Sequence, residues 1–315
     1  MKKPKLLLIG GPTAVGKTAL SIHLAQKFSG EIINGDAMQV YRHLSIGTAK
    51  PSLAERQGVP HYLLDSREID QTYSVSDFKK EATESFQTIR QKGHLPILVG
   101  GTGLYLESFL FNFDLGGEVV PHPEFRKDME AIAREEGVQA LHDRLAQQDP
   151  KAAQAIHPNN VKRVIRALEV GKFSDHLFSE QSQDHDHHQS SYDYLMIGLK
   201  TDRQLLYERI NQRVDLMMAE GLLQEAHYLY DAHLDPHYQC LQSIAYKEFF
   251  PYFRGEESLD QAILTLKRNS RRYAKRQLTW LKHRMSEVSW YDLIQHPESL
   301  QTLEEEVDAF LHTGA

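Results

Sequence analysis

Three features are scarce in this 315-residue sequence, and their scarcity narrows the classes of protein it can belong to. A single cysteine, Cys240, cannot form an intramolecular disulfide, so we expect a chain that works in the reducing cytoplasm. No apolar run reaches the roughly 18 residues that favour a membrane-spanning helix, and we expect no membrane partner. The net charge of -7 gives no bulk signal for a nucleic-acid partner.

Positive charge is nevertheless concentrated in one segment of the chain. Residues 267–284 include no acid, and their basic side chains are Lys267, Arg268, Arg271, Arg272, Lys275, Arg276, Lys282 and Arg284. A local basic face on an acidic protein is consistent with phosphate binding, for which Lys275 and Arg276 are candidates. The same arginines could instead pack on the edge of a sheet, and the sequence leaves both possibilities open.

Short buried strands alternate with amphipathic helices along much of the chain. Apolar runs predict strands at 5–9, 31–34, 95–99 and 194–199, and apolar spacing predicts helices at 18–28 and 76–91. Long helices are also predicted at 203–230 and 257–283. Strands that alternate with helices predict the α/β class, with a parallel sheet flanked by helices on both faces.

The pattern changes after residue 114. Residues 122–172 carry only helical signals, interrupted at Asp149-Pro150 and His157-Pro158. We therefore expect a core domain whose first part is 1–114, a helical insertion domain at 115–190, and a second core part with C-terminal helices at 191–315. A polar linker ends the insertion. Its His185, His187 and His188 could bind Zn²⁺, but we interpret the segment as a flexible linker.

A phosphate-binding motif follows the first predicted strand and precedes a predicted helix. It reads Gly11, Pro12, Thr13, Ala14, Val15, Gly16, Lys17 and Thr18, which matches the P-loop pattern G-x-x-x-x-G-K-[ST]. Glycines allow backbone N–H groups to converge on an anion, and the helix N-terminus attracts it. Lys17 adds a positive charge, and the Thr18 hydroxyl can hold Mg²⁺. The motif predicts a P-loop NTPase-like core that binds a diphosphate or nucleotide, without specifying the reaction.

Four further segments, together with the P-loop, resemble the bacterial tRNA dimethylallyltransferases, also called isopentenyl-tRNA transferases. These are the segments 36–41 with 46–51, 98–105, 163–169 and 272–280, so the resemblance extends from about residue 5 to 284. The family usually has serine where Asn34 and Ala37 stand, glycine where Ala245 stands and threonine where Ser270 stands. Of these departures, Ala37 bears most on the hydrogen bonds around Asp36.

The resemblance implies a specific reaction. Dimethylallyl diphosphate loses diphosphate while its C1 is captured by N6 of the adenine directly 3′ of the anticodon, in tRNAs that read codons beginning with U. The partners implied are dimethylallyl diphosphate and the tRNA anticodon stem-loop, and the insertion domain is expected to bind that stem. No pattern fixes the oligomeric state, and we expect a monomer.

The resemblance also assigns roles to individual residues. Asp36 becomes the general base, although a Mg²⁺ ligand or a loop cap would also suit an aspartate at a strand end. Lys17 and Arg213 stabilise the leaving diphosphate, with a solvated helix arginine as the alternative for Arg213. Thr102 lies against the substrate, or it serves only to form the turn.

A further set of residues is expected to contact tRNA. The resemblance places there Asp36, Ala37, Met38, Gln39, Thr102, Arg126, Lys162, Arg163, Val164, Ile165 and Arg166. The basic residues at 162–166 could alternatively form a solvated helix face with Glu169 as an ionic partner.

Two other classes of function remain open on the motifs alone. A P-loop with a helical insertion also suits a small-molecule or nucleotide kinase, and a non-catalytic RNA-binding switch could use the same loop. The prenyl-transfer hypothesis requires Asp36 to lie beside the anion pocket, in a cavity that joins the two.

Overall fold

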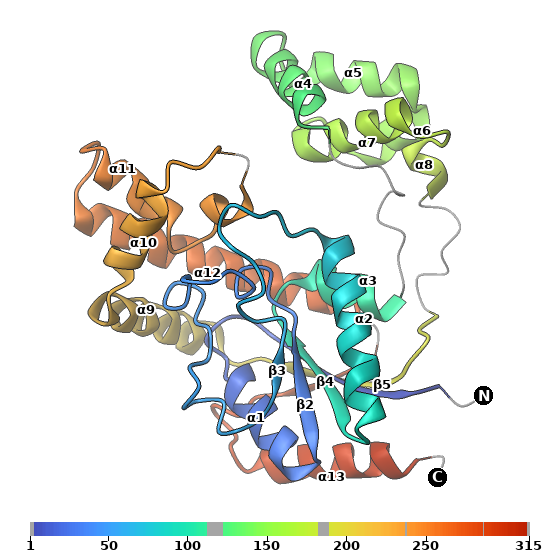
Figure 1. Ribbon diagram of the computed structural model, residues 1–315, viewed down its shortest axis with the longest axis vertical. Coiled ribbons are helices and arrows are strands. Elements are labelled where there is room, and N and C mark those ends of the chain that lie inside the picture. The colour runs from blue at the N-terminus through green and yellow to red at the C-terminus, as the bar shows by residue number, and fades with distance from the viewer. Residues whose placement is uncertain (1–2, 112–121, 182–188, 237, 286, 314–315) are drawn as a thin grey trace. The chain divides into compact units, whose positions relative to one another are not determined.

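The computed structural model describes residues 3–111, 122–181, 189–236, 238–285 and 287–313 (Figure 1). The chain divides into two compact units, one formed by Met1–Phe111 with Ser190–Ala315 and the other by Asn112–Gln189. The histidine-containing segment 184–188 lies outside the described residues. Within the described ranges, no helix combines the length and apolar character needed to cross a membrane.

The first unit is built on a parallel sheet of six strands in the order β3-β2-β4-β1-β5-β6. The strands are β1 (Lys5–Gly10), β2 (Gly30–Asn34), β3 (His61–Tyr62), β4 (Leu95–Gly100), β5 (Asp193–Leu199) and β6 (Val288–Tyr291). The central strands are short and almost wholly buried, as expected for a parallel sheet covered on both faces. The predicted α/β class, and the strands at 5–9, 31–34, 95–99 and 194–199, are confirmed.

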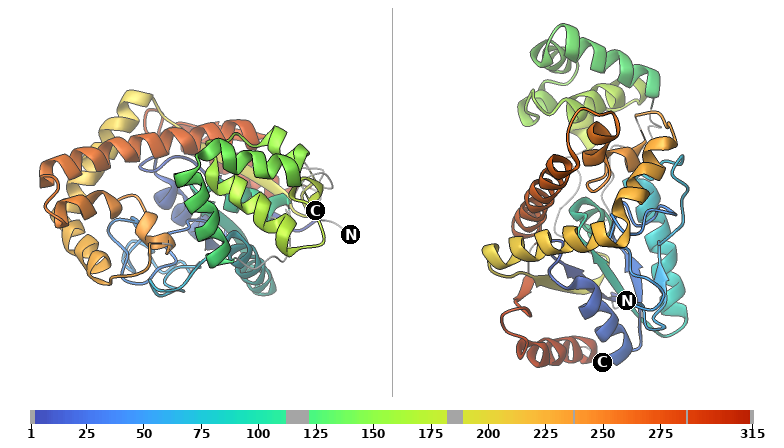
Figure 2. Two further views of the ribbon diagram at one scale, coloured as in Figure 1. Left: turned by 90° about the horizontal axis from the view of Figure 1, so that it is seen from above. Right: turned by 90° about the vertical axis from the view of Figure 1, so that its left-hand side faces the viewer.

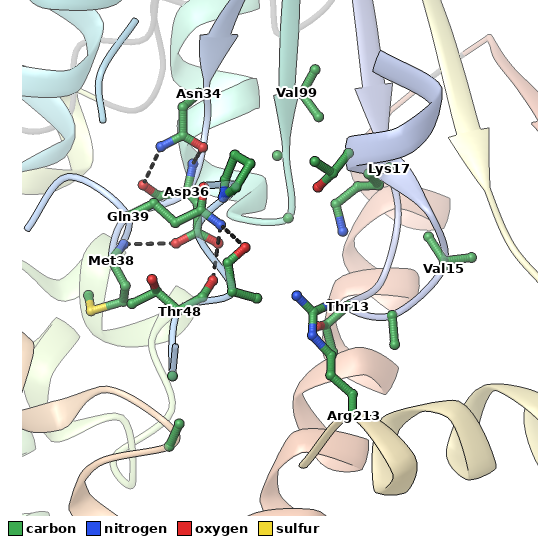
Figure 3. A pocket seen from close by; sticks show the side chains of 18 of the residues that line it. Thr13, Val15, Lys17, Asn34, Asp36, Met38, Gln39, Thr48, Val99 and Arg213 are labelled. Atoms are coloured by element: carbon green, nitrogen blue, oxygen red, sulfur yellow. Dashed lines mark hydrogen bonds between the residues drawn. The ribbon is translucent and has the colours of Figure 1, made fainter. Parts of the chain in front are cut away.

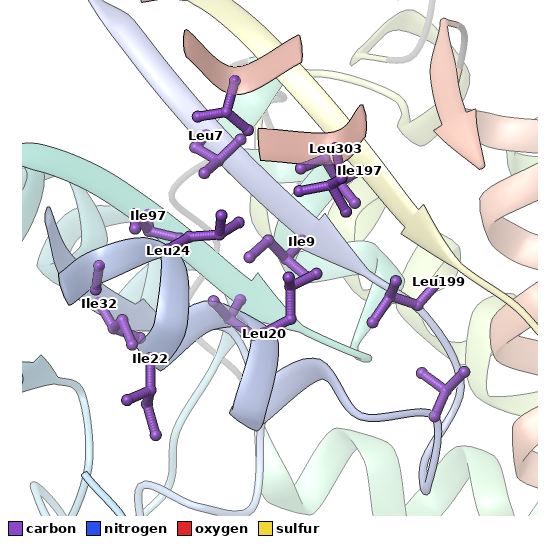
Figure 4. Packing of buried hydrophobic residues seen from close by; sticks show 14 of the residues in the cluster. Leu7, Ile9, Leu20, Ile22, Leu24, Ile32, Ile97, Ile197, Leu199 and Leu303 are labelled. Carbon is purple, nitrogen blue, oxygen red and sulfur yellow. The ribbon is translucent and has the colours of Figure 1, made fainter. Parts of the chain in front are cut away.

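Helices cover both faces of this sheet, as the right-hand view of Figure 2 shows. Side-chain alternation along β1 directs Leu7 and Ile9 toward helices α1 (Lys17–Lys27) and α13 (Ser299–His312), where they join the main apolar cluster (Figure 4). Helices α2 (Val75–Gln91) and α3 (Gly103–Phe111) cover the opposite face. The predicted helix at 76–91 is confirmed, and it begins with a capping box between Ser74 and Asp77.

The remaining helices of the first unit flank the carboxyl ends of the strands. They are α9 (Arg203–Glu220), α10 (Leu222–Asp231), α11 (Phe250–Phe253) and α12 (Leu259–Arg284), with short 3₁₀ turns at Gln239–Gln242 and Lys247–Phe249. The single helix predicted at 203–230 is two helices, because Gly221 adopts a left-handed φ of 106° and ends α9. Helix α12 confirms the long helix predicted at 257–283.

The second unit contains only helices within its described residues, as its sequence predicted. They are α4 (Pro123–Glu135), α5 (Val138–Gln148), α6 (Pro150–Ala155), α7 (Val161–Phe173) and α8 (Phe178–Gln181). Asp149 is buried and caps α6 by accepting a hydrogen bond from the Ala152 N–H at 3.0 Å. The predicted break at Asp149-Pro150 is therefore the start of a new helix. Leu141, Leu145 and the buried face of α7 form the core of this unit.

Candidate active site

The glycine-rich loop between β1 and α1 forms the first wall of the site. Gly16 has a φ of 102°, a conformation that glycine adopts at no steric cost, and it delivers the chain into α1 at Lys17. The Lys17 ammonium donates hydrogen bonds to the carbonyl oxygens of Gly11 (2.9 Å) and Pro12 (2.7 Å). The loop thus holds a lysine over a concave run of backbone, the arrangement that its sequence predicted.

Asp36 follows β2 and forms the opposite wall. Its backbone N–H donates to Asn34 Oδ1 (3.3 Å), while Asn34 Nδ2 donates to the Leu63 carbonyl oxygen (3.1 Å). Its carboxylate Oδ1 accepts the Met38 N–H at 2.8 Å. Asn34, which stands where the family usually has serine, therefore fixes the turn that presents Asp36. The loop-cap alternative for Asp36 is thus observed, and it does not exclude the predicted role as general base.

The turn after β4 joins these two walls. Gly35 donates its N–H to the Val99 carbonyl oxygen at 2.7 Å, so the two chains run in direct backbone contact. A Cβ atom at Gly100 would lie 2.3 Å from the Gly35 carbonyl oxygen, which excludes any side chain there. Thr102 Oγ1 accepts the Ala37 N–H at 3.3 Å. Ala37 thus contributes its backbone to the site, and the missing serine hydroxyl at this position breaks none of these bonds.

Helix α9 contributes two arginines. Asp202 caps the helix through the N–H groups of Gln204 and Leu205, which sets where the later turns lie. Arg209 donates to the Ala14 carbonyl oxygen of the glycine-rich loop at 3.0 Å. Arg213, one turn later, extends toward Lys17 (Figure 3). Arg213 is therefore a cavity residue of the first unit.

One cavity of about 1110 Å³ connects these elements. Its walls include the loop residues 13–18, the segment 36–39, Thr102 and Arg213. Figure 3 shows Asp36 and Met38 on one side of this space, with Lys17 and Arg213 on the other. The P-loop and Asp36 therefore line one cavity, as the prenyl-transfer hypothesis requires.

Burial changes the proton affinity of both walls. It raises the pKa of the Asp36 carboxyl above its usual value, and the Met38 N–H and the Lys17 charge only partly offset this. Burial, reinforced by the nearby Arg213 charge, lowers the pKa of Lys17 to about 8. Asp36 is therefore a stronger proton acceptor than a surface aspartate. The same burial disfavours the protonated, positively charged form of Lys17.

Helix α12 also lines the cavity, and its lining residues include Tyr273 and Gln277, for which no role was predicted. Buried Gln277 accepts the Thr13 N–H through Oε1 (3.0 Å) and donates from Nε2 to the Gly101 carbonyl oxygen (3.0 Å). It therefore links the glycine-rich loop to the turn that carries Thr102. Their spacing in the sequence could have indicated this, because residues four positions apart, such as 273 and 277, lie on the same face of a helix.

The donor set suits Mg²⁺ bound mainly through a diphosphate. Thr18 lies in the cavity lining at the start of α1, where its hydroxyl can serve as one oxygen ligand. No group of three or more acidic, histidine or cysteine side chains within the described residues could enclose a metal ion. Mg²⁺ commonly binds through few protein ligands and retains phosphate and water oxygens, so these residues fit that ion.

The second unit holds the remaining predicted tRNA contacts on helices α4 and α7. Lys162 and Arg163 are exposed, whereas Arg126 and Arg166 both form ion pairs with the buried Glu169, at 2.6 and 2.7 Å. Pairing with Glu169 was the alternative considered for the basic run 162–166, and it applies to one of its members, Arg166.

Val164 and Ile165, which were also predicted to contact tRNA, differ from their basic neighbours in exposure. Both side chains are buried in the core of the second unit, because they lie on the face of α7 that packs against α5. They position the exposed basic face of the helix and offer no side chain to an RNA surface.

Comparisons with known proteins agree with this site. The sequence model of the IPP transferase family matches residues 39–284. A tRNA dimethylallyltransferase of Enterococcus faecalis is 55% identical over 309 residues, covering 98% of this chain and 97% of that protein. The corresponding protein of Halalkalibacterium halodurans is 50% identical over 291 residues, 92% of each chain.

Solved structures lead to the same family. The full-length tRNA isopentenylpyrophosphate transferase of Bacillus halodurans superposes with a TM-score of 0.73 at 45% identity, covering 98% of this chain and 97% of that one. A eukaryotic dimethylallyltransferase described as acting on tRNA superposes with a TM-score of 0.82 at 31% identity, covering 98% of this chain and 79% of that one. The chain belongs to the tRNA dimethylallyltransferase family, the IPP transferases.

Proposed function

We propose that this protein transfers a dimethylallyl group from dimethylallyl diphosphate to N6 of the adenine 3′-adjacent to the anticodon, in tRNAs that read codons beginning with U. The products are N6-(dimethylallyl)adenosine and diphosphate. The observation that carries the proposal is the single cavity shared by the P-loop and Asp36. We further propose that it acts in the cytoplasm, which suits its one free, buried cysteine, and that it acts as a monomer.

In the proposed reaction, one bond to C1 of the dimethylallyl group forms as another breaks. The N6 lone pair forms a bond to C1 of the dimethylallyl group as the C1–O bond breaks, and the electron pair of that bond leaves with the diphosphate. N6 then carries an excess proton, which passes to the Asp36 carboxylate. Burial raises the pKa of Asp36, and a base of higher pKa takes this proton more readily.

The leaving diphosphate gains negative charge, and the P-loop side of the cavity would stabilise it. Lys17, Arg213 and the backbone N–H groups of residues 14–18 surround the space in which it would lie. Bound Mg²⁺, held by the Thr18 hydroxyl, would neutralise part of the diphosphate charge. Thr102 would contact the substrate close to the reacting atoms, since it is held beside Asp36 through the Ala37 N–H.

The tRNA would present an unstacked loop base to this cavity. Residues 36–39 line it and would contact the nucleotide, with Ala37 contributing its backbone. In the second unit, the exposed Lys162 and Arg163 would contact the tRNA phosphates, and Arg126 and Arg166, which pair with Glu169, would contribute less.

Mass spectrometry of nucleosides tests the proposal. The protein is incubated with Mg²⁺, dimethylallyl diphosphate and tRNA that lacks the modification, and the tRNA is then digested. We expect adenosine that has gained one five-carbon unit, at the position next to the anticodon. A parallel mixture with Mg²⁺ and ATP tests the kinase alternative. Production of ADP there, with no change in the tRNA nucleosides, would overturn the proposal.

A further inference from the structure

Glu225 of α10 binds a backbone turn that follows the segment carrying Asp36. Its Oε2 accepts the N–H groups of Ser45 (2.8 Å) and Ile46 (3.0 Å), and its Oε1 accepts the N–H of residue 47 (2.9 Å). The Tyr246 hydroxyl also donates to Oε1, at 2.7 Å. Three successive backbone N–H groups that converge on one anion form a nest, and the anion here is a side chain of the protein itself.

The turn formed by residues 45–49 is also held by packing and from within. A Cβ atom at Gly47 would lie 2.7 Å from ring atoms of Tyr246, so the turn packs directly against this fully buried side chain. The Thr48 hydroxyl donates to the Leu44 carbonyl oxygen at 2.7 Å, which closes the turn on itself. The positions of its carbonyl oxygens are therefore fixed.

Two of these carbonyl oxygens bind the side chain of Gln39, which lines the cavity. Gln39 Nε2 donates to the carbonyl oxygens of Thr48 (3.0 Å) and Ala49 (3.2 Å) (Figure 3). A primary amide has two N–H donors, and the reversed amide would place Oε1 against two other oxygen atoms. The group that Gln39 can offer a ligand is then Oε1, which accepts a hydrogen bond and cannot donate one.

We propose that Glu225 is a positioning residue, which keeps the Gln39 amide oxygen directed to accept a hydrogen bond from N6 of the target adenine. The inference rests on the proposed function and assigns it a residue outside the cavity lining. Adenine N6 carries two protons, so one can bond to Gln39 while the other passes to Asp36. Guanine or hypoxanthine has a carbonyl oxygen at this position, which an acceptor repels. The arrangement would thus favour adenine over a 6-oxopurine.

The variant Glu225→Gln tests the inference, because it keeps the shape of the side chain but turns one oxygen into an NH₂ group that faces other donors. Binding is measured with anticodon stem-loop RNAs that carry adenosine or inosine at the target position, without dimethylallyl diphosphate. We expect affinity for the adenosine stem-loop to fall about three- to tenfold, the range expected for loss of one hydrogen bond. Affinity for the inosine stem-loop should not fall, since a released Gln39 amide can turn its N–H groups toward the base oxygen.

Asp231→Asn is the matched control, since it removes another carboxylate of α10, which pairs with the exposed His227 at 2.8 Å. It should bind both stem-loops as the wild type does. Equal losses for the two stem-loops in Glu225→Gln would overturn the proposal, because general loosening of the site does not distinguish the bases. Tyr246→Phe removes one of the four hydrogen bonds to Glu225 and should shift the preference in the same direction by less.

A double-mutant cycle with Gln39→Met shows whether Glu225 acts through Gln39. Methionine keeps the length of the side chain and removes the amide. In this background Glu225→Gln should not weaken binding of the adenosine stem-loop any further, and losses that multiply would overturn the proposal. A wild type that transfers no five-carbon unit to this stem-loop would instead refute the proposed function.

Hydrogen exchange gives a readout that needs no RNA. The backbone N–H groups of residues 45–47 should exchange faster in Glu225→Gln than in the wild type or Asp231→Asn, while the thermal midpoint shows that the variant is folded. Unchanged exchange at these three amides would also overturn the proposal.

Discussion

The cationic side chains of the cavity differ from those of the second unit in what compensates their charge. Lys17 donates to two loop carbonyl oxygens, and within the described ranges neither Lys17 nor Arg213 forms an ion pair with a carboxylate. Arg126 and Arg166, in contrast, share the buried carboxylate of Glu169. Burial lowers the pKa of both cavity cations, and the charge of the nearby Asp36 carboxylate offsets this only in part.

This difference separates cations that are held for a ligand from cations that stabilise the fold. An uncompensated buried charge is unfavourable until an anion arrives, so its presence indicates an anion-binding site. A pair that shares one buried carboxylate contributes to the unit itself. The exposed Lys162 and Arg163 form a third class, which solvent screens in the free protein.

The largest effect should come from Asp36, the proposed general base. We expect Asp36→Asn to lower kcat about 10³-fold, because the amide keeps the shape of the side chain but cannot accept the N6 proton. Single-turnover kinetics with saturating tRNA and dimethylallyl diphosphate measure it, and tRNA binding should persist. Asp70→Asn, an exposed aspartate outside the cavity lining, is the control. Equal rates for the two variants would remove Asp36 from the chemistry.

Removing one uncompensated cation should have the next largest effect. We expect Arg213→Gln to reduce kcat/KM for dimethylallyl diphosphate about 10²-fold, because the leaving diphosphate loses one source of charge stabilisation. Affinity for tRNA should stay the same. Arg203→Gln removes an exposed arginine of the same helix and should leave kcat/KM unchanged. If both variants were equally active, Arg213 would belong with the solvated arginines.

The pH dependence of kcat/KM tests the two sides of the cavity separately, because Asp36 must be deprotonated and Lys17 must be protonated. Asp36 must be deprotonated, so kcat/KM should rise as pH rises through its elevated pKa. Lys17 must be protonated, so kcat/KM should fall above about pH 8. Burial is the main cause of the low Lys17 pKa and the Arg213 charge the second. Arg213→Gln should therefore move the alkaline limb to higher pH; an unmoved limb would assign it to another group.

Substitution of Arg126 should affect the stability of the second unit more than it affects RNA binding. We expect Arg126→Ala to destabilise this unit by about 1–3 kcal/mol, because buried Glu169 loses two hydrogen bonds from the guanidinium. Hydrogen exchange of amides in α4 and α7 measures the change locally. Arg144→Ala, which breaks an exposed pair with Glu136, is the control and should have little effect. Similar exchange in both variants would contradict the structural role.

The smallest effect should come from the exposed cations of α7. We expect Lys162→Ala and Arg163→Ala each to weaken tRNA binding several-fold and to reduce the slope of log affinity against log salt by about 1. Protein stability should not change. Lys151→Ala, an exposed lysine on α6, tests whether any positive charge in this unit has the same effect. A slope equal to that of the wild type would exclude phosphate contact.

The parts of the site that the sequence predicted are those set by local chain geometry. The motif from Gly11 to Thr18 specifies both a loop shape and the start of a helix, so its place at the end of β1 could be predicted. Asp36 and Thr102 each follow a buried strand, and in a parallel sheet those ends lie at one edge. The role of Arg213 came from the family resemblance, since an arginine within a long helix carries no local signal.

The rest depended on which helix face is buried and on tertiary contacts. The basic run 162–166 was treated as a unit, but a helix turns by about 100° per residue, so the apolar Val164 and Ile165 point into the core. Gln277 was overlooked because its partners, Thr13 and Gly101, lie 264 and 176 residues away in sequence. Strands β3 and β6 were missed because they have two and four residues and are only partly buried.

The close approach of Gly100 to Gly35 has a consequence for substrate size. Where two main chains touch, the distance between Asp36 and the Thr102 turn is fixed by peptide atoms, and no exchange of side chains can widen or narrow it. Variants that accept a longer prenyl donor must therefore gain room elsewhere in the chamber, at apolar lining residues such as Ile244, Val214 or Leu266. The distance between Asp36 and the Thr102 turn would stay the same while the prenyl chain of the donor becomes longer.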